Sequence, residues 1–231
     1  MLNVLNNTAV PVACWSCSVS HNPSTLFCPH CSKIQPPPGG DYFSVFALKP
    51  TLNLDLTALE EKFHQLSRKL HPDRFARAAE NEREWSLADT ALLNDAYRTL
   101  RDPLSRTEYL LRLTSAPVHA HTVGQDRKNT SRVPNDLLEE AFDLNMQLEE
   151  MRDARQRGEN NPELTAELAA AKTKFDALLA EVDTNLHAEW DRWDSGSDDA
   201  REQAQKAMLA LLDRRRYLAN LVRDVNETLA A

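Results

Sequence analysis

The placement of helix-breaking residues is the feature that most constrains how this chain can fold. Its five glycines, and every proline after residue 100, fall between segments in which apolar residues recur at helical intervals. No segment shows the alternation typical of a half-buried strand. We therefore predict an all-α protein, and 231 residues leave room for one large domain or a few small ones.

The middle of the chain is predicted to form a helical hairpin. Asp55 suits an N-cap, and apolar residues then follow one helix face until Pro72 ends the helix. A second helix is predicted over residues 82–101, and Asp102-Pro103 ends it. Its expected buried side consists of Trp85, Ala88, Leu92, Ala96 and Leu100. A short helix near residues 42–48 completes the unit.

Three long helical patterns occupy the C-terminal part of the chain. They are separated from the hairpin by a polar segment, residues 115–133, that is predicted to be a linker. Asn161 before Pro162 matches an N-cap followed by proline in the first turn, and Ser197 precedes two acidic residues suited to a helix start. Short connections imply an antiparallel three-helix bundle. The predicted helices cover residues 135–157, 162–193 and 197–229.

All four cysteines fall in two C-x-x-C pairs near the N-terminus, which is not how a disulfide framework would be spread over a chain this long. Four thiolates suffice for a closed, tetrahedral and therefore structural zinc site, with iron as the chemical competitor. A redox dithiol is the alternative, but it would accompany a βαβ pattern. With four sulfurs available, His21 and His30 are expected to be bystanders. The predicted ligands are Cys14, Cys17, Cys28 and Cys31.

Charge and hydropathy exclude several classes of protein. A net charge of −8 argues against a nucleic-acid footprint over the whole chain, so any basic surface must be local. No run of about 18 apolar residues exists, and the N-terminus resembles neither a signal nor a transit peptide. We expect a cytosolic protein without a membrane partner. No phosphate-binding loop or nucleophile–base set is evident, so no nucleotide site and no catalytic residue are predicted.

His71-Pro72-Asp73 follows the first long helix, whose polar face is basic. Pro72 fixes its own φ and disfavours helix at His71, so the turn would present Asp73 rigidly to a cationic partner. The basic residues would steer encounter with an acidic surface. By itself the tripeptide would more often be a helix-terminating turn beside a solvated face. The basic residues are Lys62, Arg68, Lys69 and Arg74.

The first helix of the predicted bundle carries two apolar stripes. One stripe, Leu137, Ala141, Leu144, Leu148 and Met151, is enough to pack against two neighbouring helices. The other stripe, Leu138, Phe142 and Met146, lies one residue further round the helix. It belongs either to a broad core face or to an apolar surface turned outward.

Four further segments are distinctive: residues 41–46 (DYFSVF), 71–75 (HPDRF), 93–100 (LNDAYRTL) and 103–111 (PLSRTEYLL). They closely resemble the HscB family, the J-domain co-chaperones of iron–sulfur cluster assembly. The resemblance covers essentially the whole chain from residue 41, and the cysteine pairs resemble those of the branch with an N-terminal zinc module. It implies a cytoplasmic bacterial member, since no transit peptide is visible.

The resemblance implies roles for the singled-out residues. His71, Pro72 and Asp73 would stimulate the ATPase of a DnaK/HscA-class chaperone, which the basic helix docks. The face with Leu138, Phe142, Asp143 and Met146 would bind an IscU-type scaffold protein, with Tyr217 of the last helix beside it. Met146 stands where family members often carry Glu, and Glu139 where an apolar residue is common. Self-association is also possible for such a bundle.

Three other functions remain as alternatives. A general DnaJ-like co-chaperone would have a Gly/Phe-rich segment and repeated C-x-x-C-x-G-x-G modules, which are absent. A zinc-ribbon protein that binds nucleic acid is opposed by the acidity of the chain. A redox enzyme would use one cysteine pair. The predicted organisation is a zinc-binding module (1–34), a linker (35–40), a J-domain (41–114), a linker (115–133) and a client-binding bundle (134–231).

Overall fold

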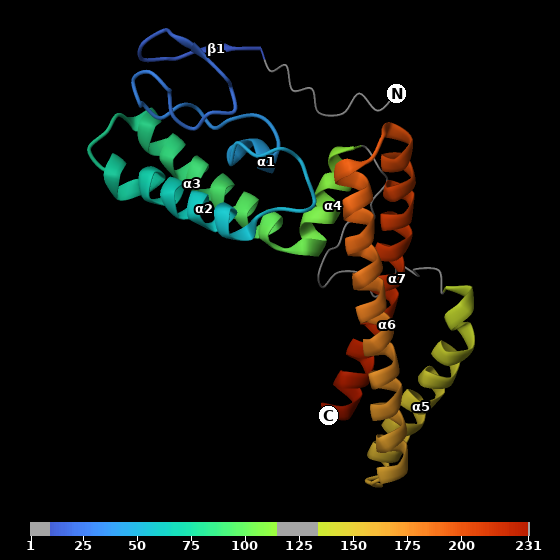
Figure 1. Ribbon diagram of the computed structural model, residues 1–231. Helices are drawn as coiled ribbons and strands as arrows, with labels where there is room; N and C mark the ends of the chain where they lie inside the picture. Colours follow the sequence, from blue (N-terminus) through green and yellow to red (C-terminus); the bar gives the residue numbers. More distant parts are fainter. Residues whose placement is uncertain (1–9, 115–133, 231) are drawn as a thin grey trace. The chain divides into compact units, whose positions relative to one another are not determined.

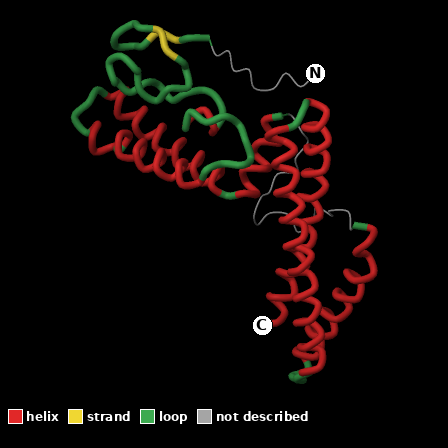
Figure 2. Tube along the Cα trace, viewed as in Figure 1, coloured by secondary structure: helices red, strands yellow, loops and turns green. Residues whose placement is uncertain are grey.

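The computed structural model describes residues 10–114 and 134–230, and the chain divides into two compact units between residues 119 and 120. Helices dominate both units (Figure 1, Figure 2), so the all-α prediction is confirmed. The predicted linker over residues 115–133 lies outside the described residues. Within the described segments, no helix is both long enough and apolar enough to cross a membrane.

The first unit begins with a module, residues 10–35, that contains the four cysteines. A small antiparallel sheet joins β1 (Val12–Ala13) to β2 (Ser20–His21), with Val12 opposite His21. These strands were not predicted, because two residues are too few to show an alternating pattern. The rest of the module consists of turns and loops that bring the two cysteine pairs together.

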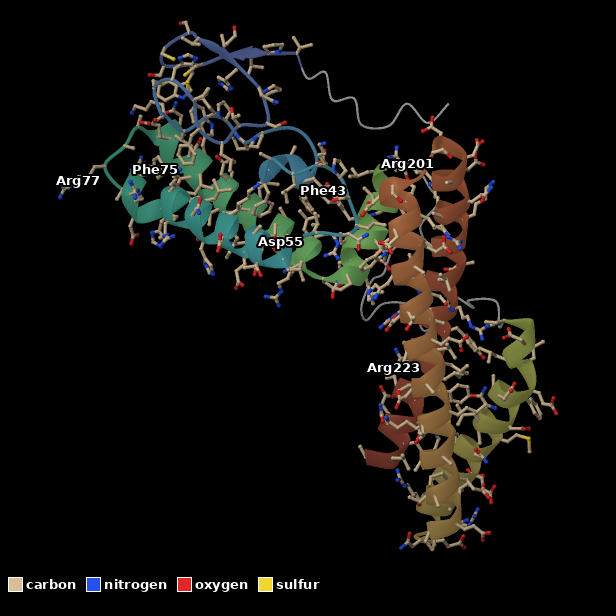
Figure 3. The ribbon with its side chains drawn as sticks, in the orientation of Figure 1. Phe43, Asp55, Phe75, Arg77, Arg201 and Arg223 are labelled. Atoms are coloured by element: carbon tan, nitrogen blue, oxygen red, sulfur yellow. The ribbon has the colours of Figure 1, made fainter. Side chains whose placement is uncertain are left out.

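A helical hairpin of α2 (Leu56–Leu70) and α3 (Glu80–Arg101) forms the body of the first unit, as predicted. Asp55, labelled in Figure 3, caps α2 by accepting a hydrogen bond of 3.0 Å from the backbone N–H of Ala58. The short helix α1 (Tyr42–Val45) packs against α3, and Phe43 is fully buried.

The helix α4 (Pro103–Leu113) was not predicted as a separate element. Pro103 does end α3, but it also occupies the first turn of α4, where its missing N–H costs nothing. Asp102 caps this helix by accepting a 2.8 Å hydrogen bond from the N–H of Ser105. Tyr109 of α4 stacks on Tyr42 of α1 at 4.5 Å and accepts a 2.8 Å bond from its N–H, which ties the two ends of the hairpin unit together.

The buried face of α3 differs from the predicted one. Ala88, which the apolar pattern assigned to the inside, is exposed, and Trp85 and Leu92 are only half-buried. Hydropathy places polar side chains outside, whereas three polar residues of α3 are buried, and two of them, Glu82 and Ser86, make tertiary contacts described below. The residues that α3 buries are Glu82, Ser86, Asp89, Leu93, Ala96 and Leu100.

The second unit is the predicted three-helix bundle. A 3-10 turn, η2 (Asn135–Leu137), leads into α5 (Leu138–Gln156), which is followed by α6 (Pro162–Ser195) and α7 (Asp198–Ala230). Asn161 caps α6 by accepting a 3.0 Å hydrogen bond from the N–H of Leu164, as expected. The long helices α6 and α7 pack along each other, and α5 contacts both of them (Figure 1). The core includes Leu144, Leu148, Leu168, Phe175, Leu218 and Val225.

Candidate functional site

The turn with His71, Pro72 and Asp73 lies where α2 gives way to the 3-10 helix η1 (Pro72–Phe75). His71 has φ −54° and ψ 127°, a non-helical conformation of the kind that a following proline favours. Its ring Nδ1 accepts a 3.3 Å hydrogen bond from the N–H of Asp73. The Asp73 carboxylate is 91% exposed. The turn therefore presents an accessible anion on an ordered backbone.

Two hydroxyls of α3 hold the end of α2 just before this turn. The carbonyl oxygen of Leu70 accepts a 2.6 Å hydrogen bond from Ser86 Oγ and a 3.3 Å bond from Thr90 Oγ1. Helix ends leave carbonyls without intrahelical partners, so these bonds satisfy a buried acceptor and fix the direction of the chain. Sequence reasoning missed both residues, because a hydroxyl in a helix usually indicates the solvent side.

The predicted docking cations are not equivalent. Lys69 and Arg74 are exposed and have no carboxylate partner within the described part of the chain. Arg68 is exposed too and donates to the carbonyl of His64 at 3.2 Å. Lys62 is half-buried, and its Nζ donates to the Phe46 carbonyl at 3.1 Å, so it also ties α2 to the loop after α1.

An unpredicted cation extends this basic surface beyond the turn. Arg77, which follows η1, is exposed, and its side chain points away from the ribbon in Figure 3.

The second apolar stripe of α5 faces outward. Leu138, Phe142 and Met146 are 51%, 64% and 56% exposed, whereas the first stripe is buried in the bundle core. This exposure answers the question that the sequence left open, since a broad core face would have buried both stripes. Three large apolar side chains in a row on one helix are typical of a surface that binds another protein.

The two remaining residues of the predicted scaffold-binding set differ in burial. Asp143 is exposed beside Phe142 on α5. Tyr217 of α7 is half-buried and packs against the bundle core, and this burial raises the pKa of its hydroxyl. Asp143 is therefore accessible to a partner, whereas Tyr217 offers only part of its ring.

The two C-x-x-C knuckles have the same backbone geometry. In each pair, the residue after the second cysteine has a positive φ, 59° at Ser18 and 58° at Ser32. Its N–H donates to the carbonyl of the first cysteine, at 2.9 Å from Ser18 to Cys14 and at 3.0 Å from Ser32 to Cys28. These tight turns direct the sulfurs of each knuckle toward the other knuckle.

The four sulfurs form a compact cluster. Cys14 Sγ lies 3.7 Å from Cys31 Sγ, Cys17 Sγ lies 3.7 Å from Cys28 Sγ, and all four lie within 4.8 Å of one another. A tetrahedral ion with metal–sulfur bonds of about 2.3 Å separates its ligands by about 3.8 Å. The geometry of the cluster can therefore hold a metal ion.

The pKa values of Cys14 and Cys17 are shifted in opposite directions. Burial raises the pKa of Cys14, but hydrogen bonds from the N–H groups of Cys17 and Ser16 outweigh it and lower that pKa to about 6. At Cys17 the Val19 N–H lowers the pKa, but burial and the neighbouring thiols outweigh it and raise the value to about 12. Four thiolates at this spacing therefore require a positive ion between them.

Polar residues around the cluster support its ligands. Gln35, which the sequence assigned to a linker, is buried and donates from Nε2 to Cys14 Sγ at 3.5 Å. His21 is buried with both ring nitrogens engaged, Nε2 by Gln35 Oε1 at 3.0 Å and Nδ1 by Thr25 Oγ1 at 2.9 Å. Because both ring nitrogens already have partners, His21 is not one of the candidate metal ligands and instead stabilises the module by hydrogen bonds.

Several known proteins that are similar to this chain are described as HscB co-chaperones. No protein-family model matches it. The iron-sulfur cluster co-chaperone protein HscB of mouse is 29% identical over 225 residues, which cover 95% of this chain and 83% of the mouse protein. A co-chaperone protein HscB homolog of Shewanella loihica is 35% identical over 150 residues, 63% of this chain and 87% of that protein. The crystal structure of human co-chaperone protein HscB matches with a TM-score of 0.65 and 26% identity, covering 94% of this chain and 98% of the human one.

Proposed function

Because this chain belongs to the HscB family of co-chaperones, we propose that it delivers an IscU-type iron–sulfur scaffold to a DnaK/HscA-class chaperone and stimulates that chaperone's ATPase. The observation that carries the proposal is the exposed His71-Pro72-Asp73 turn, which α3 holds beside cations without a carboxylate partner in the described segments. In this proposal the chain acts as an activator of the chaperone and needs neither a catalytic residue nor a nucleotide of its own. The predicted cytoplasmic location remains a prediction.

The chaperone is proposed to dock on α2 and the turn. Lys69, Arg74 and Arg68 lack carboxylate partners among the described residues, so their charge is available to an acidic surface. Such steering weakens with salt. Lys62 should matter less for docking, because its ammonium already bonds to the Phe46 carbonyl.

The scaffold is proposed to bind the exposed stripe of α5. Burying a complete side chain of this kind gains about 1.5–3 kcal/mol. Since Leu138 and Phe142 are 51% and 64% exposed, covering them supplies roughly 2–3 kcal/mol together. Association and ordering cost several kcal/mol, so these two side chains alone cannot hold the complex. Met146, Asp143 and the edge of Tyr217 must also contribute if the complex is reversible and near micromolar affinity.

The cysteine cluster is proposed to hold one structural zinc ion, with Cys14, Cys17, Cys28 and Cys31 as its ligands. Sulfur spacing and closed four-thiolate coordination support zinc, and iron in the same site is the competing ion. Metal analysis of purified protein should give one zinc per chain. Substantial iron, with the visible absorption of iron–thiolate bonds, would favour the competitor.

Steady-state ATPase measurements on the cognate chaperone test the chaperone half of the proposal. The wild-type chain should stimulate hydrolysis, and His71→Gln should abolish that stimulation while still binding the scaffold. Equal stimulation by both proteins would refute the proposed role of the turn.

A binding measurement tests the scaffold half. Leu138→Ala combined with Phe142→Ala should weaken scaffold binding by roughly 30- to 150-fold, which corresponds to about 2–3 kcal/mol, yet leave ATPase stimulation without scaffold intact. Leu87→Ala is a matched control, because it removes a leucine that is 60% exposed from α3. Unchanged scaffold affinity in the double variant would favour a general DnaJ-like co-chaperone.

A further inference from the structure

We propose that the cysteine module positions the His71-Pro72-Asp73 turn, because Trp15 and Lys33 of the module hold the first turns of α3, which in turn anchor that loop. The consequence for ATPase stimulation rests on the proposed function. The positioning itself concerns contacts within the first unit and can be measured without a partner protein.

Trp15 lies between the two cysteines of the first knuckle and joins both knuckles to α3. Its indole Nε1 donates a 2.7 Å hydrogen bond to the carbonyl of Ile34, just after the second knuckle. Its ring meets that of Trp85 edge-to-face, with centroids 5.6 Å apart and an angle of 67°. Such aromatic pairs contribute beyond their buried area and fix an orientation. The position of Trp85 therefore depends on folded knuckles.

Lys33 makes the second contact, from two residues after Cys31. Its Nζ lies 2.9 Å from Oε1 of Glu82, and the Glu82 side chain is only 8% exposed. The other oxygen of this carboxylate, Oε2, accepts a 3.4 Å hydrogen bond from the N–H of Ala79, the residue before α3. One buried carboxylate is thus shared between the module and the start of α3. Removing Lys33 would leave that charge unpaired in a buried place.

These contacts lead directly to the turn. Ser86 follows Trp85 in the chain and lies one helical turn after Glu82, on the same face of α3. Its hydroxyl donates to the carbonyl of Leu70, immediately before His71. Ala79, held by Glu82, lies after the turn. The first turns of α3 therefore hold both ends of the loop, and the module contacts those same turns through Trp85 and Glu82.

A positioning role and a purely stabilising role would affect different residues. A merely stabilising module would change the whole first unit to a similar extent when it is weakened. A positioning module acts first on residues 71–82 and leaves the middle of α2, with its docking cations, in place. The maximal stimulation of the chaperone would then fall, while the concentration of co-chaperone needed for half-maximal stimulation would not.

Hydrogen exchange of the full-length metal-loaded protein tests this distinction. Lys33→Ala should accelerate exchange in residues 71–82 by at least about tenfold, given the strength of a hydrogen bond between charged groups, and leave residues 57–68 unchanged. Lys33→Arg should restore protection. Asp95→Asn is the matched control, since it breaks the exposed Asp95–Arg98 pair near the other end of α3 and should leave residues 71–82 unchanged.

ATPase stimulation by the same variants should agree with the hydrogen-exchange result. Lys33→Ala and Trp15→Ala should lower the maximal stimulation several-fold without changing the half-maximal concentration, and removal of the metal by a chelator should reproduce the exchange pattern. Wild-type exchange in residues 71–82 of Lys33→Ala, or equal acceleration throughout the first unit, would overturn the proposal. If the wild-type chain stimulates no chaperone, the proposed function fails, but the exchange result still decides the positioning role.

Discussion

Asp89→Asn should stabilise the first unit at neutral pH, and the gain should disappear in acid. Asp89 is fully buried on α3, and neither carboxylate oxygen has a hydrogen-bond partner within the part of the chain that the structure describes. Burial without a partner disfavours the charged form and raises the pKa of this carboxyl from 3.8 to about 7. An amide of nearly the same shape removes the charge and keeps the packing.

The pKa of Asp89 sets both the sign and the size of the effect. Below pH 3.8 the carboxyl is protonated in both the folded and the unfolded chain, so it costs nothing. Between pH 3.8 and about 7 the unfolded chain releases this proton and the folded chain keeps it, so stability falls as the pH rises. Above about pH 7 the folded chain also carries the buried charge, and the loss of stability is complete. At about 1.4 kcal/mol per pKa unit it reaches at most about 4 kcal/mol.

Urea unfolding at several pH values measures this effect. Pulses of hydrogen exchange during the titration distinguish the unfolding of α3 from that of the bundle. The free energy of unfolding of Asp89→Asn should equal that of wild type near pH 4 and exceed it increasingly up to pH 7. Asp95→Asn, which removes an exposed carboxylate from the same helix, should differ by less than about 1 kcal/mol at every pH. A difference between Asp89→Asn and wild type that does not vary with pH would refute the reasoning.

Three further predictions concern single contacts. Ser86→Ala should cost about 1–2 kcal/mol in urea unfolding of the first unit, because it removes the 2.6 Å bond to the Leu70 carbonyl. Gly158→Ala should cost about 1 kcal/mol in the bundle, because Gly158 has φ +72° after α5 although open space surrounds it; thermal unfolding of the bundle checks this. Chelating the metal should expose residues 10–35 to hydrogen exchange and leave the bundle unchanged, since the four cysteines all lie in the first unit.

Local signals in the sequence were sufficient to predict most of the helices. Asp55 and Asn161 cap helices where expected, and Pro72 ends α2 within two residues of the predicted point. Each of these signals acts through the backbone of its own neighbours, so it needs no knowledge of the fold. The cysteine knuckles were predictable for the same reason, since four sulfurs in two close pairs can converge without help from the rest of the chain.

The contacts that shape the turn could not be predicted in this way. Lys33 and Glu82 are 49 residues apart, and nothing in either local sequence indicates the other. Ser86 and Asp89 are polar residues on a buried helix face, so an apolar pattern places the buried side of α3 on Ala88 instead. Only the packed hairpin reveals that a hydroxyl is needed there to satisfy the carbonyl of Leu70.

The exposed stripe of α5 argues for a binding role on energetic grounds. Leu138 and Phe142 leave more than half of their surface in water, so truncating them should change the free energy of unfolding far less than truncating the buried Leu144. A chain that keeps large apolar side chains in water gains little fold stability from them and accepts a risk of aggregation. In the proposed function their benefit comes from a scaffold protein that covers them. Truncating Leu138 and Phe142 should therefore weaken scaffold binding strongly and change the free energy of unfolding little.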